Sequence, residues 1–122
     1  MDELYVTIVG FKNYYDQTPF GIGSLIRCSK EPNNLYDKEA IKCTLPAIGT
    51  VGYIANNVNT VAGGTMSAGR VYDKVKGRFY ARVMFTTSSK IICKVENGDL
   101  KELEKELQKQ LNDDWLDGED DD

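Results

Sequence analysis

Apolar and polar residues alternate along much of the chain up to residue 96, as they do in strands that place one face on a core. This alternation predicts strands over residues 4–11, 24–30, 39–45, 50–54, 69–77, 78–85 and 90–96. Several short strands, separated by turns that contain Gly and Pro, favour a small, mostly antiparallel barrel or curled sheet. The expected fold is mainly β, and it is α+β because two helices are also predicted.

Two segments have the apolar spacing of helices. In residues 55–68 the apolar side chains recur at helical intervals, although Gly63 and Gly64 each weaken a helix by about 1 kcal/mol. In residues 98–112 one leucine stripe predicts an amphipathic helix, with Asp99 as N-cap and Glu102 completing a capping box. The stripe consists of Leu100, Leu103, Leu107 and Leu111. We therefore expect one helix inserted in the barrel and a C-terminal helix packed on or beside it.

Charge divides the chain into a basic body and an acidic end. Up to Val95 there are twelve basic residues and seven acids, a net charge of +5, whereas from Glu96 onward three lysines accompany twelve acids, a net charge of −9. With 122 residues and 41% hydrophobic content, the chain can form one domain. We expect a barrel domain over residues 1–97, the amphipathic helix over 98–112 and a disordered acidic tail over 113–122.

Several kinds of chemistry are disfavoured by the residue types present. The sequence contains no histidine, which removes Ser-His and Cys-His nucleophile pairs and imidazole metal ligands. The three cysteines are widely spaced and include no C-x-x-C pair, so they are expected to be reduced, buried thiols. The acids of the body are scattered, whereas a metal-dependent nuclease or phosphatase needs a cluster. We expect a binding protein without catalytic residues, metal or cofactor.

The same features bear on location. No stretch approaches the roughly 18 consecutive apolar residues that would span a membrane. The N-terminal segment begins with two acids after Met1 and lacks the basic region of a signal peptide. A cytoplasmic protein with no membrane partner is predicted.

Basic residues alternate with tyrosine along one face of each of the two strands predicted over 69–77 and 78–85. In the second strand, Arg78, Tyr80 and Arg82 point away from the face that carries Phe79 and Val83. Such a face is often only a solvated surface. It is also the composition of a nucleic-acid surface, in which Lys and Arg neutralise phosphates while tyrosine rings stack on bases.

The densest set of polar side chains lies between two predicted strands, in "EPNNLYDKEAI" (31–41). Taken alone, the asparagines are ordinary turn residues, Asp37 could accept backbone N–H bonds and Tyr36 could lie at the rim of the core. The segment resembles the signature of the HIRAN domain, acid-Pro-Asn-Asn-x-Tyr-Asp-Lys-x-Ala-Ile. "VGFKNYY" (9–15) and "TVGYIANN" (50–57) resemble two further parts of that family in the same order.

The resemblance, over roughly residues 4–96, implies an OB-like antiparallel β-barrel. The family occurs in Swi/Snf-type fork-remodelling ATPases and as small free-standing bacterial or phage proteins, which suggests a role connected with DNA repair or replication. For this chain the resemblance implies a DNA-binding module that captures single-stranded DNA at a free 3′ end.

The site residues are carried over from the family one at a time. Tyr36 and either Tyr14 or Tyr15 would stack on the terminal base. Asp37 would accept a hydrogen bond from the 3′-hydroxyl, a donor that only a strand end possesses. Asn33 and Asn34 would supply amide contacts and shape the turn, and Lys12 and Lys38 would lie near phosphates. A second group of candidates consists of Asn56, Arg78, Tyr80, Arg82 and Phe85.

The chain departs from the family pattern in two places. End-binding members place an arginine directly before the tyrosine pair, whereas here Asn13 separates Lys12 from Tyr14. A basic residue expected just after the Val-Gly-aromatic strand is replaced by Asn56, which would weaken one phosphate contact.

Two alternatives remain at this point. The same barrel could be a protein-interaction module that uses the leucine stripe to pair with another helix or to form a homo-oligomer. The acidic end is most simply a solubilising tail, and the sharper alternative is an intramolecular lid that competes with DNA for the basic face.

Overall fold

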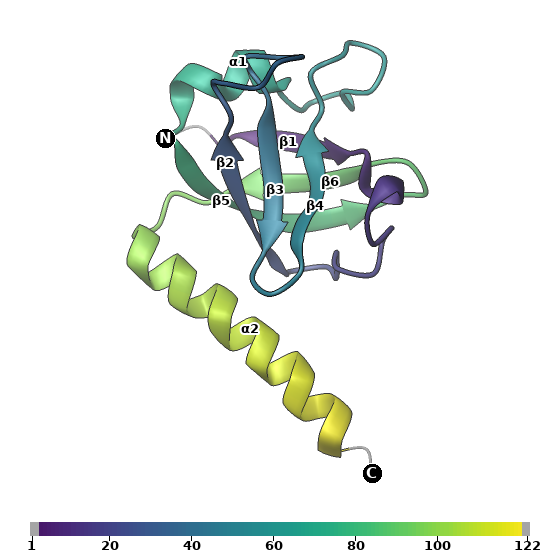
Figure 1. Ribbon diagram of the computed structural model, residues 1–122, viewed down its shortest axis with the longest axis vertical. Helices are drawn as coiled ribbons and strands as arrows, with labels where there is room; N and C mark the ends of the chain where they lie inside the picture. The colour runs from purple at the N-terminus through teal and green to yellow at the C-terminus, as the bar shows by residue number, and fades with distance from the viewer. Residues whose placement is uncertain (1–2, 121–122) are drawn as a thin grey trace.

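Six antiparallel strands close into a barrel in the order β1-β4-β3-β2-β5-β6 (Figure 1). The computed structural model describes residues 3–120, and their side chains up to Leu111. The strands are β1 (Tyr5–Val9), β2 (Leu25–Lys30), β3 (Ile41–Leu45), β4 (Gly49–Ile54), β5 (Arg78–Thr86) and β6 (Ile91–Val95). The barrel predicted from alternation and from the family resemblance is confirmed.

The barrel interior is filled by the apolar residues of the alternating pattern. Val6 and Ile8 of β1 have no exposed surface, and neither do the three cysteines, Cys28, Cys43 and Cys93. Cys28 and Cys43 lie opposite each other in the β2–β3 register, and all three thiols are free. Burial raises the pKa of Cys43 and of Cys93, so both stay protonated. The prediction of buried, reduced thiols is confirmed.

The helix predicted over residues 55–68 is wrong. These residues form turns whose ends are bound to β1: the Ala55 amide donates to the Thr7 carbonyl and the Met66 amide to the Tyr5 carbonyl, both at 2.7 Å. Gly64 adopts φ +83°, which a helix does not permit. Val58, part of the supposed apolar stripe, is 87% exposed. Pairing with the edge of β1 therefore replaces the hydrogen bonds that a helix would have made.

The strand predicted over residues 69–77 is also wrong. The segment holds the short helix α1 (Ala68–Val71) and a 3-10 turn, η2 (Tyr72–Lys74). Ser67 is the N-cap of α1, since its hydroxyl accepts a hydrogen bond from the Arg70 amide at 3.3 Å. Val71 is buried, and Val75, four positions later, is partly buried, a spacing that fits both a strand and a helical turn. The N-cap decides between the two.

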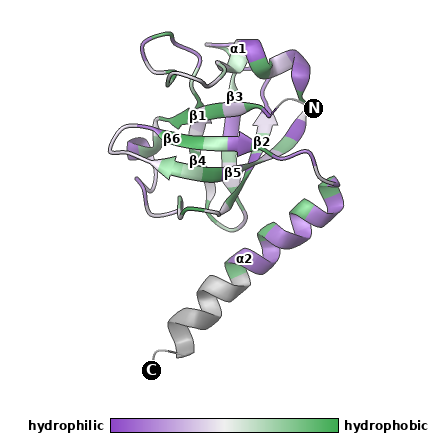
Figure 2. Ribbon diagram, turned by 180° about the vertical axis from the view of Figure 1, so that it is seen from behind, coloured by the Kyte–Doolittle hydropathy of each residue, from purple (hydrophilic) through white to green (hydrophobic). Residues whose placement is uncertain are grey.

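The C-terminal helix α2 (Leu100–Asp120) packs across β2 and β5. Asp99 accepts a hydrogen bond from the Glu102 amide at 3.1 Å, which confirms the predicted N-cap. Leu103 and Leu107 are buried in the core, and Leu100 packs against it. Hydrophilic and hydrophobic residues alternate along the part of α2 beside the barrel (Figure 2). Three of the four leucines of the stripe are thus packed on the chain's own barrel.

The helix continues beyond the predicted end at residue 112. It runs to Asp120, where the sequence predicted a disordered acidic tail, and residues 121–122 lie outside the described part of the chain. In Figure 1, α2 extends away from one end of the barrel, while α1 and the β2–β3 connection lie at the other end. Among the described helices, none has the length and apolar character needed to cross a bilayer.

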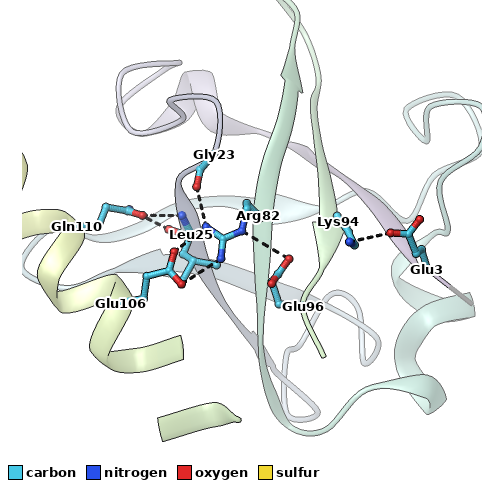
Figure 3. Close-up of polar contacts among 8 residues, drawn as sticks. All are labelled: Glu3, Gly23, Leu25, Arg82, Lys94, Glu96, Glu106 and Gln110. Carbon is cyan, nitrogen blue, oxygen red and sulfur yellow. Dashed lines mark hydrogen bonds and ion pairs between the residues drawn. The ribbon is translucent and has the colours of Figure 1, made fainter. Parts of the chain in front are cut away.

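Acidic side chains of α2 pair with the basic residues of the strands beneath it. Arg82 of β5 donates to both carboxylate oxygens of Glu106, at 2.7 and 3.1 Å, and lies 3.6 Å from Glu96 (Figure 3). Next to this ion pair, the Gln110 side chain accepts a hydrogen bond from the Leu25 amide at 2.7 Å and donates one to the Leu25 carbonyl at 3.2 Å. These contacts hold α2 in one register on the barrel.

Candidate functional site

The turn between β2 and β3 is shaped by Asn34. Its side-chain oxygen accepts hydrogen bonds from the amides of Tyr36 and Asp37, at 2.8 and 3.0 Å, and its nitrogen donates to Glu31 at 3.1 Å. The Glu31 amide closes the base of the turn on the Ala40 carbonyl at 2.9 Å. This arrangement leaves the Tyr36 side chain 97% exposed. Asn34 therefore presents the tyrosine and positions the carboxylate that follows it.

Asp37 is held from two sides. One of its oxygens accepts from the Glu39 amide at 2.9 Å, and the other from the side-chain amide of Asn56 at 3.2 Å. The same Asn56 nitrogen lies 3.3 Å from Glu39, and the Asn56 oxygen accepts from the Gly69 amide at 2.8 Å. Each carboxylate oxygen of Asp37 keeps one further lone pair for an outside donor. Asn56 thus fixes Asp37 and connects the turn to α1.

Part of this hydrogen-bonded network lines an open groove of about 580 Å³. Its walls come from the 34–40 turn, from β4 and from the segment after it. Five of its lining residues are Asn34, Tyr36, Asp37, Tyr53 and Asn56. Four of these five were predicted from the sequence, and the structure brings them together.

Tyr53 is the groove residue that the sequence reasoning missed. It lies on β4 opposite Val9 of β1 and Lys42 of β3, with its side chain partly exposed. Burial and the neighbouring Glu31 carboxylate raise the pKa of Tyr53 to about 12, and Tyr14 adds to the effect. The signal was available, because Tyr53 alternates with the buried Ile54 and so belongs on the outer face of its strand.

The other predicted residues of the N-terminal part lie in different places. Tyr14 is 44% exposed and is not among the residues that line the groove. Tyr15 donates to the Ile48 carbonyl at 3.2 Å and lines a separate cleft beside α2. Lys12 lines a small hollow away from the groove, whereas Asn33 lines a hollow of about 390 Å³ that shares Asn34 with the groove. Lys38 is exposed next to Asp37.

The predicted basic face of β5 is not free. Tyr80 is only 1% exposed, and its hydroxyl donates to Glu104 of α2. Arg82 forms ion pairs with Glu106 and Glu96. Arg78, at the start of the strand, is exposed and lines another cleft, and Phe85 is 63% exposed at the far end. A helix that sequence periodicity could not place has covered the middle of this face.

The groove combines aromatic rings, amides and carboxylates. Aromatic faces can stack on a flat ring, and a fixed carboxylate can accept a hydrogen bond from a hydroxyl. Among the described residues, no group of three or more cysteine and acidic side chains could hold a metal ion. The arrangement suits recognition of a ligand that has both a planar ring and a hydroxyl.

Comparison with known proteins gives a family match over the barrel. The sequence model of the HIRAN domain family matches residues 1–97. Among solved structures, the HIRAN domain of human HLTF superposes with a TM-score of 0.54 at 19% identity, covering 88% of this chain and 87% of that one. A protein from Lactobacillus plantarum gives 0.53 at 21% identity, covering 76% and 90%. No curated protein sequence matches.

Proposed function

The chain belongs to the HIRAN domain family, a family of DNA-binding modules, and from that premise we propose that it binds single-stranded DNA at a free 3′-hydroxyl end. The observation that carries the proposal is the pairing, in one groove, of the exposed ring of Tyr36 with the fixed carboxylate of Asp37. The protein acts by binding and carries out no reaction. Its buried free thiols suit the reducing cytoplasm.

The rings of the groove hold the terminal base. Tyr36 is free to stack because the Asn34 turn holds its backbone and leaves its ring in solvent. Tyr53 supplies a second ring on the groove wall. Tyr15 is bonded to the Ile48 carbonyl and lines the cleft beside α2, so Tyr14 is the member of the pair that is left to take part. Stacking is worth roughly 1–3 kcal/mol per base and tolerates all four bases, because every base has a π-face.

Asp37 provides the preference for an end. A 3′-hydroxyl can donate to its free lone pair, whereas a sugar that continues into a phosphate has no such donor. A terminal phosphate would also bring negative charge beside Asp37 and Glu39, which Asn56 holds close together. The groove therefore favours a hydroxyl over a phosphate at the same position.

A binding titration tests this role. Short single strands that end in a 3′-hydroxyl or a 3′-phosphate are titrated at two salt concentrations, and the hydroxyl form is expected to bind about tenfold tighter or more, since an unmade hydrogen bond at such a site costs about 1–3 kcal/mol. Equal affinity for the two ends would refute end recognition. Weak binding that does not respond to salt would refute nucleic-acid binding altogether.

The variant Asp37→Asn tests whether Asp37 is the source of the preference for a 3′-hydroxyl end. An asparagine amide placed against the Asn56 amide loses one of the bonds that fix this side chain, so the preference for the hydroxyl end is expected to fall toward equality. Asp16→Asn is the matched control: Asp16 is an exposed acid outside the groove with φ 54°, a conformation that asparagine tolerates. The control keeps the full preference.

A protein-interaction role has one feature in its favour. Tyr15, Ile48 and Leu111 line a partly apolar cleft between α2 and the β3–β4 hairpin, of about 420 Å³. Three leucines of the stripe are packed on the barrel, so Leu111 alone is left to contribute to such a surface. Light scattering over a range of protein concentrations tests self-association, and a monomer throughout would exclude a homo-oligomer.

A further inference from the structure

Four basic residues lie along the segment from α1 to the start of β5. Arg70, Lys74, Lys76 and Arg78 are all exposed, and we refer to them as the basic edge. In the part of the chain that the structure describes, none of the four is within ion-pair distance of a carboxylate, in contrast to Arg27 and Arg82. One acid, Asp73, lies in the same segment. Glu96 lines the same cleft as Lys74, Lys76 and Arg78 but is paired with Arg82 at 3.6 Å. With four cations against Asp73, the edge carries an excess of positive charge.

The basic edge is held rigidly against the end of β2. The Lys30 amide donates to the Gly77 carbonyl at 2.9 Å, and the Lys30 ammonium donates to the Val75 carbonyl at 2.8 Å while lying 4.4 Å from the centre of the Tyr72 ring. Lys30 is the last residue of β2, and the 31–40 turn follows directly. The groove turn and the basic edge therefore start from the same end of one strand.

The two surfaces also meet at α1. The Gly69 amide donates to Asn56, which lines the groove, and a Cβ at Gly69 would lie 2.6 Å from a carboxylate oxygen of Glu39. Arg70, the next residue, is the first of the four cations. At the other end, Lys74, Lys76 and Arg78 line a cleft of about 190 Å³ beside the β6–α2 connection. The segment runs from α1 at one end of the barrel toward β5 (Figure 1).

We propose that the basic edge binds the sugar–phosphate backbone of the strand whose 3′ end occupies the groove. The strand leaves the groove past Asn56, crosses α1 at Arg70 and continues toward the cleft at Arg78. The inference rests on the proposed function, because the groove supplies the point from which the strand departs. It assigns separate tasks to the two surfaces, since the groove selects the end and the edge supplies affinity in proportion to strand length.

The chemistry fits this division. Asp37 lines the groove and Glu39 lies beside it, bonded to the same Asn56 nitrogen, and these carboxylates suit a hydroxyl and repel phosphate. The phosphates therefore need cations outside the groove. Asn56 accepts a hydrogen bond from the Gly69 amide, and the next residue, Arg70, is the first cation of the basic edge. An OB-like module typically covers about 4–16 nucleotides, so a strand longer than the few residues that fit a groove has a surface to follow.

The test compares single strands of three and twelve nucleotides, both ending in a 3′-hydroxyl, by fluorescence anisotropy between 50 and 200 mM salt. The variant Lys74→Gln/Lys76→Gln/Arg78→Gln is expected to bind the 12-mer roughly tenfold more weakly at low salt and to reduce the slope of log K against log salt by about 2, because each single-strand phosphate contact contributes about 0.7. Binding of the 3-mer is expected to change less than twofold.

The matched control is Lys101→Gln/Lys105→Gln/Lys109→Gln, which removes the same charge from exposed positions of α2. It is expected to leave the slope unchanged. Thermal unfolding establishes that both variants are folded, and the single substitutions Lys74→Gln and Arg78→Gln, each lowering the slope by about 0.7, repeat the test with a smaller change to the protein.

The outcomes separate this inference from the function on which it rests. The role proposed for the basic edge would be wrong if the two triple variants lost equal affinity for the 12-mer. It would also be wrong if the 12-mer bound no tighter than the 3-mer. An acidic peptide that competes as well as the 12-mer would also overturn it, in favour of a protein partner. If the 3′-phosphate strand binds as tightly as the hydroxyl strand while the slope still depends on the edge, end recognition fails and the edge stands.

Discussion

Arg27 of β2 and Glu104 of α2 form a two-pronged ion pair. The arginine donates from Nε to Oε1 at 3.2 Å and from Nη2 to Oε2 at 2.5 Å, and the Tyr80 hydroxyl donates to the same carboxylate. Both partners are partly buried, with side chains 18% and 29% exposed. Such planar pairs are stronger and more specific than single contacts. The helix after the barrel is therefore joined to it by polar contacts as well as by leucines.

Loss of the Glu104 charge should destabilise the fold. Glu104→Gln leaves Arg27 without its counter-ion in a partly buried setting, so the free energy of unfolding is expected to fall by about 1–2 kcal/mol. Glu102→Gln is the control, because Glu102 is 71% exposed and forms only a 3.6 Å pair with Lys105. It should stay within about 0.5 kcal/mol of the wild type in urea unfolding. If the two variants lowered the free energy of unfolding equally, the Arg27–Glu104 pair would contribute nothing to stability.

The same pair makes stability depend on pH. Burial alone would raise the pKa of Glu104, but hydrogen bonds from Arg27, Tyr80 and Gln108 outweigh it and lower the pKa to about 2. A carboxyl with a depressed folded-state pKa stabilises the fold above its usual value of 4.5 and loses that contribution as the pH falls toward 2. The hydrogen bond from Arg82 lowers the pKa of Glu106, which acts in the same direction.

Urea unfolding at several pH values checks this dependence. The difference in unfolding free energy between the wild type and Glu104→Gln is expected to be full above pH 4.5 and to shrink as the pH falls toward 2. A difference that stays constant over this range would show that the Glu104 charge is not the cause of the stabilisation.

Tyr36 should matter for binding and not for folding. Its side chain is 97% exposed, so Tyr36→Ala is expected to change the unfolding free energy by less than about 0.5 kcal/mol. Loss of one stacking ring should weaken binding of single-stranded DNA by about 1–3 kcal/mol. The neighbouring Leu35 is 92% exposed and lies outside the groove lining, so Leu35→Ala controls for removal of an exposed apolar side chain. If Leu35→Ala weakens binding equally, the role assigned to Tyr36 is wrong.

Gly52 allows β1 and β4 to approach closely. A Cβ at this position would lie 2.7 Å from Cγ2 of Ile8 and 3.0 Å from the Val9 carbonyl oxygen, inside a barrel with no spare room. Gly52→Ala is therefore expected to lower the unfolding free energy by about 1–3 kcal/mol. Gly63→Ala is the control, because no atom lies within 4 Å of its Cβ position and its φ is not positive. Thermal unfolding midpoints for the two variants distinguish them.

Local pattern accounts for most of the strands. Six of the seven predicted strands are present, because period-two alternation is a property of consecutive residues and each strand buries one face. The two errors, over 55–68 and 69–77, adjoin each other. There the apolar spacing was compatible with more than one structure, and hydrogen bonds to β1 and the Ser67 cap made the choice.

The sequence by itself determined the barrel, the buried thiols, the start of α2 at Asp99 and the turn that carries Tyr36 and Asp37. All of these depend on residues that are neighbours along the chain. Tertiary structure alone decided that Tyr53 joins the groove, that Asn56 fixes Asp37 and that α2 covers Tyr80. The Asn56–Asp37 and Tyr80–Glu104 contacts join residues 19 and 24 positions apart, so they form only once the barrel closes and α2 packs on it.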